Sequence, residues 1–187
     1  MITGVVLAGG ASSRFGGTPK GLQLFRGRAM ALVVADVLRG VCERVVIEAP
    51  RGAGYEALGL PVIHAAAAHA GRGPLAGIVA GLAAASKGDL VAFAPCDMPL
   101  ISDRLYRALM RDKGSAYAVS PRGAEALVAV LRSDALSHLS ATLSLDKLPR
   151  TVAALEAAGA RGVEFDDATP FANVNTPEDL ARLARLE

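Results

Sequence analysis

The sequence predicts an α/β protein, a Rossmann-like three-layer α/β/α sandwich with a mostly parallel central sheet. Apolar, β-branched runs of strand length alternate along the chain with helical segments. The run at 90–94 is apolar throughout, which is typical of a central parallel strand buried on both faces. Apolar residues make up 52% of the 187 residues, which is enough for a substantial core.

The first half of the chain alternates regularly. We expect strands at 2–7, 44–49, 60–63 and 90–94. We expect helices at 29–39, 74–86 and 103–111. Gly40 and Gly88 follow the first two helices as stop signals, and Ser102 is placed to cap the third.

The second half is less regular. We expect strands at 116–120, 126–131 and 163–165, and helices at 134–142 and 151–158. Thr176 caps a final helix, with Pro177 at its first position and Asp179 completing a capping box. With neither repeats nor a linker in the sequence, we expect one domain over residues 1–187.

Composition excludes several classes of protein. The net charge is +2 without a cluster of basic residues, which argues against nucleic-acid binding. No apolar run approaches the roughly 18–20 residues of a membrane span, and the start of the chain lacks the pattern of a signal peptide, so we expect a cytoplasmic protein. Cys42 and Cys96 are too few for a disulfide framework, and we interpret Cys96 as a small buried residue at a strand end.

A glycine-rich segment follows the first predicted strand directly. Residues 7–20 read L-A-G-G-A-S-S-R-F-G-G-T-P-K. Glycines allow a sharp turn whose N–H groups converge on an anion, and Arg14 and Lys20 add positive charge at its two ends. A plain strand-to-helix turn would not need two cations and a proline at set positions. The segment therefore predicts binding of a nucleoside triphosphate.

The two best-known phosphate motifs do not occur here. The chain has no Gly-Lys-Ser or Gly-Lys-Thr of a P-loop, and the loop after the first strand lacks G-x-G-x-x-G. Residues 71–77 contain G-x-G-x-x-x-G, but Pro74 lies inside that turn. We expect this second segment to contact the base and ribose beside the first loop.

Four ordered motifs resemble the molybdenum cofactor guanylyltransferases of the nucleotidyltransferase superfamily. They are the loop at 7–20, G-P-L-A-G at 73–77, P-C-D-M-P at 95–99 and N-V-N-T-P-E-D-L at 173–180. The resemblance spans nearly the whole chain and is weakest between 115 and 169. It implies a nucleotide-binding part at about 1–112 and an acceptor-binding part at about 113–187.

The resemblance implies a Mg²⁺ ion held by Asp97 and Asn175, with Arg14, Lys20 and Asp97 as catalytic residues. Asp97 also follows the carboxyl end of an apolar strand, where open α/β sheets place their ligands. Asn175 before Thr-Pro is equally consistent with shaping a turn. The implied nucleotide-binding residues are Leu7, Ala8, Gly9, Gly10, Ser12, Arg14, Lys20, Pro74, Leu75, Gly77 and Asp97.

The reaction that the resemblance implies is transfer of GMP from GTP to the molybdopterin cofactor, with release of pyrophosphate. The Gly9-Gly10 pair implies guanine, because relatives that use CTP tend to have L-A-A-G there. Transient contact with proteins that deliver or receive the cofactor is implied as well. Two alternatives stay open: a transferase with another base or acceptor, such as CTP with molybdopterin or a sugar phosphate, and a subunit that binds nucleotide without turnover.

This chain departs from the family pattern at three places. Glu48 stands where the family has an asparagine, and His64 and Ala65 stand where it has an aspartate that contacts the nucleotide. A neutral His64 could accept one hydrogen bond, or it could be a structural residue at a strand end. The pair Glu125-Ala126 replaces a His/Gln-Pro pair. These departures leave base selectivity, the acceptor and the roles of Asn173 and Glu125 open.

Overall fold

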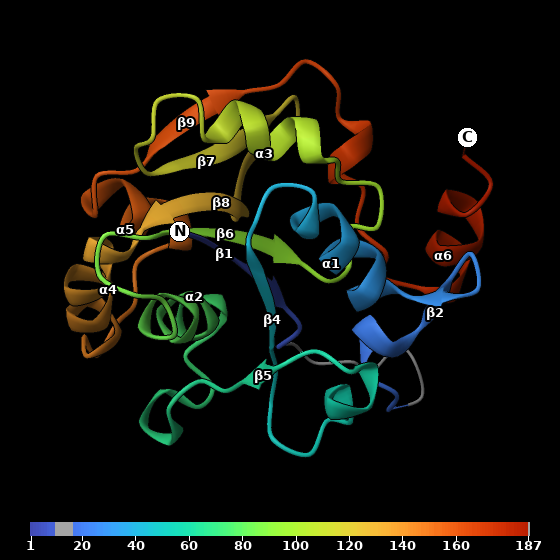
Figure 1. Cartoon of the computed structure of the whole chain (residues 1–187), viewed down its shortest axis with the longest axis horizontal. Helices are drawn as coiled ribbons and strands as arrows, with labels where there is room; N and C mark the ends of the chain where they lie inside the picture. The colour runs from blue at the N-terminus through green and yellow to red at the C-terminus, as the bar shows by residue number, and fades with distance from the viewer. Residues whose placement is uncertain (10–16, 187) are drawn as a thin grey trace.

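The computed structural model describes residues 1–9 and 17–186, and within these residues a seven-stranded sheet forms the centre of the molecule (Figure 1). Its strands are β1 (Ile2–Leu7), β4 (Arg44–Glu48), β5 (Val62–Ile63), β6 (Leu90–Pro95), β7 (Ala116–Ser120), β8 (Gly123–Arg132) and β9 (Arg161–Glu164). The strand order is β5-β4-β1-β6-β8-β7-β9. Only β8 runs antiparallel to its neighbours in this described sheet, so the predicted mostly parallel α/β fold is confirmed.

Helices cover both faces of the sheet (Figure 1). They are α1 (Met30–Arg39), α2 (Pro74–Ala83), α3 (Asp103–Leu109), α4 (Leu136–Leu143), α5 (Thr151–Ala157) and α6 (Pro177–Leu183). One buried cluster lies between the sheet and α1 with α3, and another lies between the sheet and α2, α4 and α5. Among the described residues, no helix is both long and apolar enough to cross a membrane.

The chain reverses its direction of winding beside β1. From β1 it proceeds through α1 to β4 on one side, and it later returns through α2 to β6 on the other side of β1. Open α/β sheets bind their ligands outside the carboxyl ends of the strands at such a reversal. The fold therefore predicts a ligand site at the loops that follow Leu7 and Pro95.

Several predicted boundaries were wrong for local reasons. The strand at 60–63 begins only at Val62, because Pro61 has no N–H to donate, although its carbonyl accepts from the Ile47 N–H at 2.9 Å. The helix at 134–142 begins as a 3-10 turn, and its α-helical part starts at Leu136. Ser102 holds the N-cap position of α3, but its side chain makes no capping hydrogen bond.

A hairpin that we did not predict lies between η2 and α1 in the chain and packs against the C-terminal helix. Strands β2 (Leu24–Phe25) and β3 (Arg28–Ala29) pair around Arg26 and Gly27, which have φ of 51° and 79°. Positive φ at both central residues is typical of a type I′ hairpin turn. This hairpin and α6 share a small buried cluster, formed by Phe25, Met30, Val174 and Leu183.

Candidate active site

The carboxyl ends of β4, β1 and β6 lie in register. Leu7 pairs with Glu48 on one side and with Pro95 on the other. The hydrogen bonds continue past the strand ends, since the Ala8 N–H donates to the Glu48 carbonyl at 2.8 Å and the Cys96 N–H donates to the Leu7 carbonyl at 3.0 Å. Residues far apart in the chain therefore leave the sheet side by side at this edge.

A cavity of about 940 Å³ lies at this edge. Its walls are the loop after β1, the ends of β4 and β6, the segment 64–71 and the first turn of α2. Most of the lining is alanine, glycine and proline, and the described charged residues are Lys20, Glu48, Arg51 and Asp97. A mostly apolar cleft with few placed polar groups is the usual form of a small-molecule site.

Lys20, Asp97 and Asn175 meet at one end of the cavity. The Lys20 Nζ donates to Asp97 Oδ2 at 2.9 Å and to Asn175 Oδ1 at 2.9 Å. The Lys20 and Asp97 side chains are 21% and 22% exposed, so the ion pair remains open to exchange with a ligand. The structure thus brings together three of the predicted site residues, although nearly the whole chain separates the first from the last.

Lys20 is held by a buried tyrosine that sequence reasoning missed. Lys20 opens the 3-10 helix η2 (Lys20–Leu22), and the next N–H, that of Gly21, donates to Tyr55 Oη at 3.2 Å. Burial raises the pKa of Tyr55 above its ordinary value, so the phenol stays neutral. No local motif marks Tyr55, because the contact joins residues 34 positions apart.

Asn175 is held by the start of α6. The Val174 N–H donates to the Asp97 carbonyl at 2.8 Å, and this fixes residues 173–175 beside the loop after β6. The Asn175 N–H donates to Asp179 Oδ2 at 3.1 Å, and Asp179 with Thr176 forms the predicted capping box. The capping box therefore fixes the backbone of Asn175 as well as the start of the helix.

The oxygens of Asp97 and Asn175 fit a divalent cation. Both atoms bind the same ammonium group, which shows that they converge on one positively charged point. Carboxylate and amide oxygens are the ligands that hard divalent ions prefer. No group of three or more His, Cys, Asp or Glu capable of holding a metal occurs in the described part of the chain. Two protein oxygens would therefore leave the other coordination positions to phosphate and water.

Glu48 forms a separate polar point in the cavity wall. Its side chain lies between Gly9 and Gly77, and a Cβ atom added to Gly77 would come within 2.7 Å of Glu48 Oε2. Glu48 is only 6% exposed, and burial raises its pKa. A hydrogen bond from the Ala65 backbone and the nearby His64 act in the opposite direction without cancelling the effect of burial.

The tautomer of His64 follows from its hydrogen bond. His64 Nδ1 lies 2.8 Å from the Ala49 carbonyl oxygen. A carbonyl only accepts, so Nδ1 carries the proton and a neutral ring keeps Nε2 as an acceptor. Its half-buried ring lines the cavity.

Most of the predicted nucleotide-binding residues that the structure describes line the cavity. These are Leu7, Ala8, Gly9, Lys20, Pro74, Gly77 and Asp97. Leu75 is 3% exposed and belongs to the core cluster beneath α2 instead. Gly10, Ser12 and Arg14 lie outside the described residues, so their predicted roles stay predictions.

Two further residues of the sequence analysis have defined surroundings. Cys96 is 6% exposed, and burial raises its pKa to about 12, so the thiol stays neutral and the prediction of a buried structural residue is confirmed. Glu125 accepts a hydrogen bond from Ser120 Oγ at 2.9 Å. Leu127, two residues further along β8, lines the cavity.

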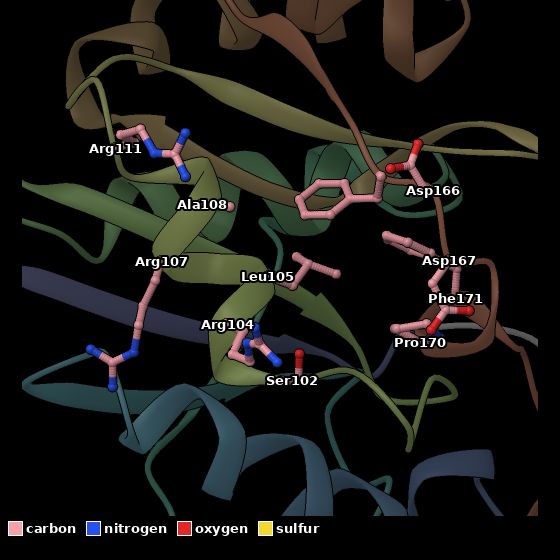
Figure 2. Close-up of a pocket in the computed structure, with 11 residues that line it drawn as sticks. Ser102, Arg104, Leu105, Arg107, Ala108, Arg111, Asp166, Asp167, Pro170 and Phe171 are labelled. Atoms are coloured by element: carbon pink, nitrogen blue, oxygen red, sulfur yellow. The ribbon is translucent and has the colours of Figure 1, made fainter.

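A second cavity, of about 550 Å³, lies between α3 and the segment 165–171 (Figure 2). Arg104 and Arg107 lie on α3, Arg111 lies just after it, and Asp166 and Asp167 lie across the hollow. None of the residues that line it belongs to the predicted site. Its wall carries charges of both signs, and it is separate from the cluster of Lys20, Asp97 and Asn175.

The fold and the cavity define a nucleotide-binding α/β protein. The family model for the MobA-like NTP transferase domain matches residues 4–161, and the chain belongs to this family of nucleotidyltransferases. A family of this kind points to a divalent metal ion in the reaction.

Known proteins with related sequences and structures span nearly the whole chain. A "Molybdenum cofactor guanylyltransferase" of Yersinia pestis (strain Pestoides F) is 38% identical over 95% of this chain and 92% of its own length. A protein of the same name from Cupriavidus pinatubonensis is 36% identical over 96% of this chain and 94% of its own. The structure of molybdopterin-guanine dinucleotide biosynthesis protein A from Archaeoglobus fulgidus shares the fold with a TM-score of 0.77, at 23% identity over 98% of this chain and 97% of that one.

Proposed function

We propose that this protein transfers GMP from GTP to the molybdopterin form of the molybdenum cofactor. An oxygen of the terminal phosphate of the acceptor forms a bond to the α-phosphorus of GTP, the bond from that phosphorus to the β-phosphate bridge breaks, and pyrophosphate leaves. The convergence of Lys20, Asp97 and Asn175 on one point of the cavity carries the proposal. The relatives that match 95–96% of the chain bear the name of this activity.

The residues of the site have distinct roles in this proposal. Lys20 neutralises phosphate charge as a compact cation, which stabilises the charge that develops on the leaving pyrophosphate. Asp97 and Asn175 would hold Mg²⁺, which would supply positive charge against the phosphate oxygens of the nucleotide. No covalent intermediate on the protein is required, because the acceptor phosphate is itself a nucleophile.

The remaining parts of the chain complete the proposal. Residues 1–112 bind the nucleotide, and residues 113–187 contribute to the binding of the acceptor. The low net charge of +2 and the sequence without a long apolar run support a cytoplasmic reaction that involves neither nucleic acid nor membrane. Transient contacts with proteins that deliver or receive the cofactor belong to the same proposal.

Pyrophosphate release tests the proposal. The purified protein is supplied with GTP, CTP, ATP or UTP and Mg²⁺, with and without molybdopterin acceptor. We expect release with GTP only when the acceptor is present. Preference for CTP or another acceptor would identify a related transferase, and nucleotide binding without release under any condition would identify a binding subunit.

A further inference from the structure

The cavity wall at the end of β4 contains the carboxylate of Glu48, which has no role in the proposed phosphate chemistry. We call this part of the cavity the base end. Glu48 ends β4 and Asp97 follows β6, with β1 between these two strands. Neighbouring strands lie about 4.8 Å apart, so the two strands are roughly 10 Å from each other. Glu48 is therefore carried well away from the cluster of Lys20, Asp97 and Asn175.

Next to the Glu48 carboxylate, the structure places the ring of His64 and the backbone of Ala65. In the described part of the chain, no lysine or arginine forms an ion pair with it. The backbone of Ala65 contributes one hydrogen bond. A buried carboxylate has room for further donors and is unfavourable without them. A ligand in this cavity that brings N–H groups would satisfy it.

The wall around this carboxylate is made mostly of backbone and methyl groups, with the side chains of His64 and Leu7 beside them. A Cβ atom at Gly9 would lie 3.2 Å from Glu48 Oε2, and one at Gly77 would lie 2.7 Å from it. Ala65 and Ala76 line the cavity nearby. Because the glycines and alanines here carry at most a methyl group, a flat heterocycle can lie against this part of the wall.

Among the four bases, guanine alone offers a carboxylate two adjacent donors. Its ring N1–H and its 2-amino group lie side by side, and each can donate to one carboxylate oxygen. Adenine and cytosine present an amino group next to a ring nitrogen that only accepts, and uracil presents one N–H between two carbonyls. A carboxylate repels each of those acceptors, so it favours guanine and disfavours the others.

We propose that Glu48 is the residue that selects guanine, with its carboxylate accepting hydrogen bonds from N1–H and the 2-amino group. This inference rests on the proposed function, because it takes the nucleotide to be GTP. Glu48 is a specificity-determining residue and touches none of the reacting atoms.

Paired measurements with GTP and inosine triphosphate test this role. Inosine triphosphate keeps the N1–H and lacks only the 2-amino group. Titration calorimetry measures the Kd of both nucleotides with the wild-type protein, with Glu48→Gln and with Glu56→Gln, which removes an exposed carboxylate outside the cavity. Thermal melts show that each variant is folded, and the side chain in Glu48→Gln keeps its volume.

We expect the wild-type protein and Glu56→Gln to bind GTP about 10- to 100-fold more tightly than inosine triphosphate, as is typical of a hydrogen bond to a charged group. Glu48→Gln should reduce that ratio by about tenfold, mainly by weakening GTP. A wild-type ratio near one overturns the proposal, because nothing then reads the 2-amino group. An unchanged ratio in Glu48→Gln also overturns it, because another group then reads guanine.

Failure of the proposed function gives a different result. If the GTP preference depends on Glu48 but no guanylyl transfer occurs with molybdopterin, the base selection stands and the reaction is wrong. If transfer from GTP occurs and Glu48→Gln keeps the full preference, the reaction stands and the assignment of Glu48 is wrong. Tighter binding of CTP than of GTP by the wild-type protein would contradict both.

Discussion

The two ends of the nucleotide cavity differ in whether their charged side chains are paired with opposite charges. At one end, the Lys20 ammonium is matched by oxygens of Asp97 and Asn175 in a partly exposed cluster. At the other end, the carboxylate of Glu48 is buried, and no described lysine or arginine forms an ion pair with it. The first arrangement suits exchange with a polyphosphate and a metal ion, and the second suits a neutral base that brings its own hydrogen-bond donors.

The two ends also differ in how they are assembled. In the first cluster, Asp97 lies 77 positions and Asn175 lies 155 positions along the chain from Lys20. Glu48 is placed by strand register alone, because β4 pairs directly with β1. Damage to the hairpin or to α6 should therefore affect the phosphate end and spare the base end.

The largest effect should come from Asp97→Asn. Removing a charged ligand at a phosphoryl-transfer site should lower kcat about 10³-fold or more, while the fold persists because Asp97 is outside the core. Pyrophosphate release and a thermal melt measure the two quantities. Asp103→Asn, which alters an exposed aspartate on α3, is the matched control and should keep its activity. Near-normal turnover in folded Asp97→Asn would remove Asp97 from the mechanism.

Lys20→Ala should weaken binding of the triphosphate by about 10- to 100-fold, because a charge-assisted bond to phosphate is lost. The effect should be smaller for GMP and absent for guanosine, which carries no phosphate. Calorimetry with the three ligands measures this, and Lys87→Ala serves as an exposed control. An equal loss for all three would show that Lys20 supports the fold rather than the phosphates.

Gly77→Ala should lower the free energy of unfolding by about 1–3 kcal/mol, because its methyl group would meet Glu48 Oε2 at 2.7 Å. In a double-mutant cycle, Glu48→Ala should relieve most of the loss of stability that Gly77→Ala causes. Gly81→Ala is the control on the same helix: it meets the Phe93 ring at 2.6 Å, and Glu48→Ala should not rescue it. Equal rescue of both variants would mean that Glu48 does not fill the space beside Gly77.

The smallest effect should be a change of stability with pH. Burial raises the pKa of Glu48 from its ordinary value of 4.5, so the folded protein binds this proton more tightly than the unfolded chain does. The resulting stabilisation is present in full below pH 4.5 and is lost as the pH rises through the folded value. Glu48→Gln should therefore melt slightly higher than wild type at neutral pH, and the difference should shrink on acidification. A difference in Tm that does not change with pH would contradict the buried ionisation.

Much of the fold could be predicted because its signals are local. β1 and β7 were predicted to the residue, and the capping box of Thr176 and Asp179 forms as expected. The hairpin of β2 and β3 was not predicted, because its strands are only two residues long. Its two-residue Arg26-Gly27 turn was the available signal, since a glycine at the second central position is typical of type I′ turns.

Sequence by itself determined the alternation of strands and helices, the chemical types of Lys20, Asp97 and Asn175, and the unusual presence of a glutamate at position 48. These follow from periodicity and from motifs, which act over a few residues. Only the tertiary structure decided that Asp97 and Asn175 both accept from the Lys20 ammonium. It also decided that Tyr55 supports the turn carrying Lys20, and that Glu48 lies between Gly9 and Gly77. Those relations depend on strand order and register across the sheet, and distant segments acquire them only when the core brings the carboxyl ends of β4, β1 and β6 to one edge.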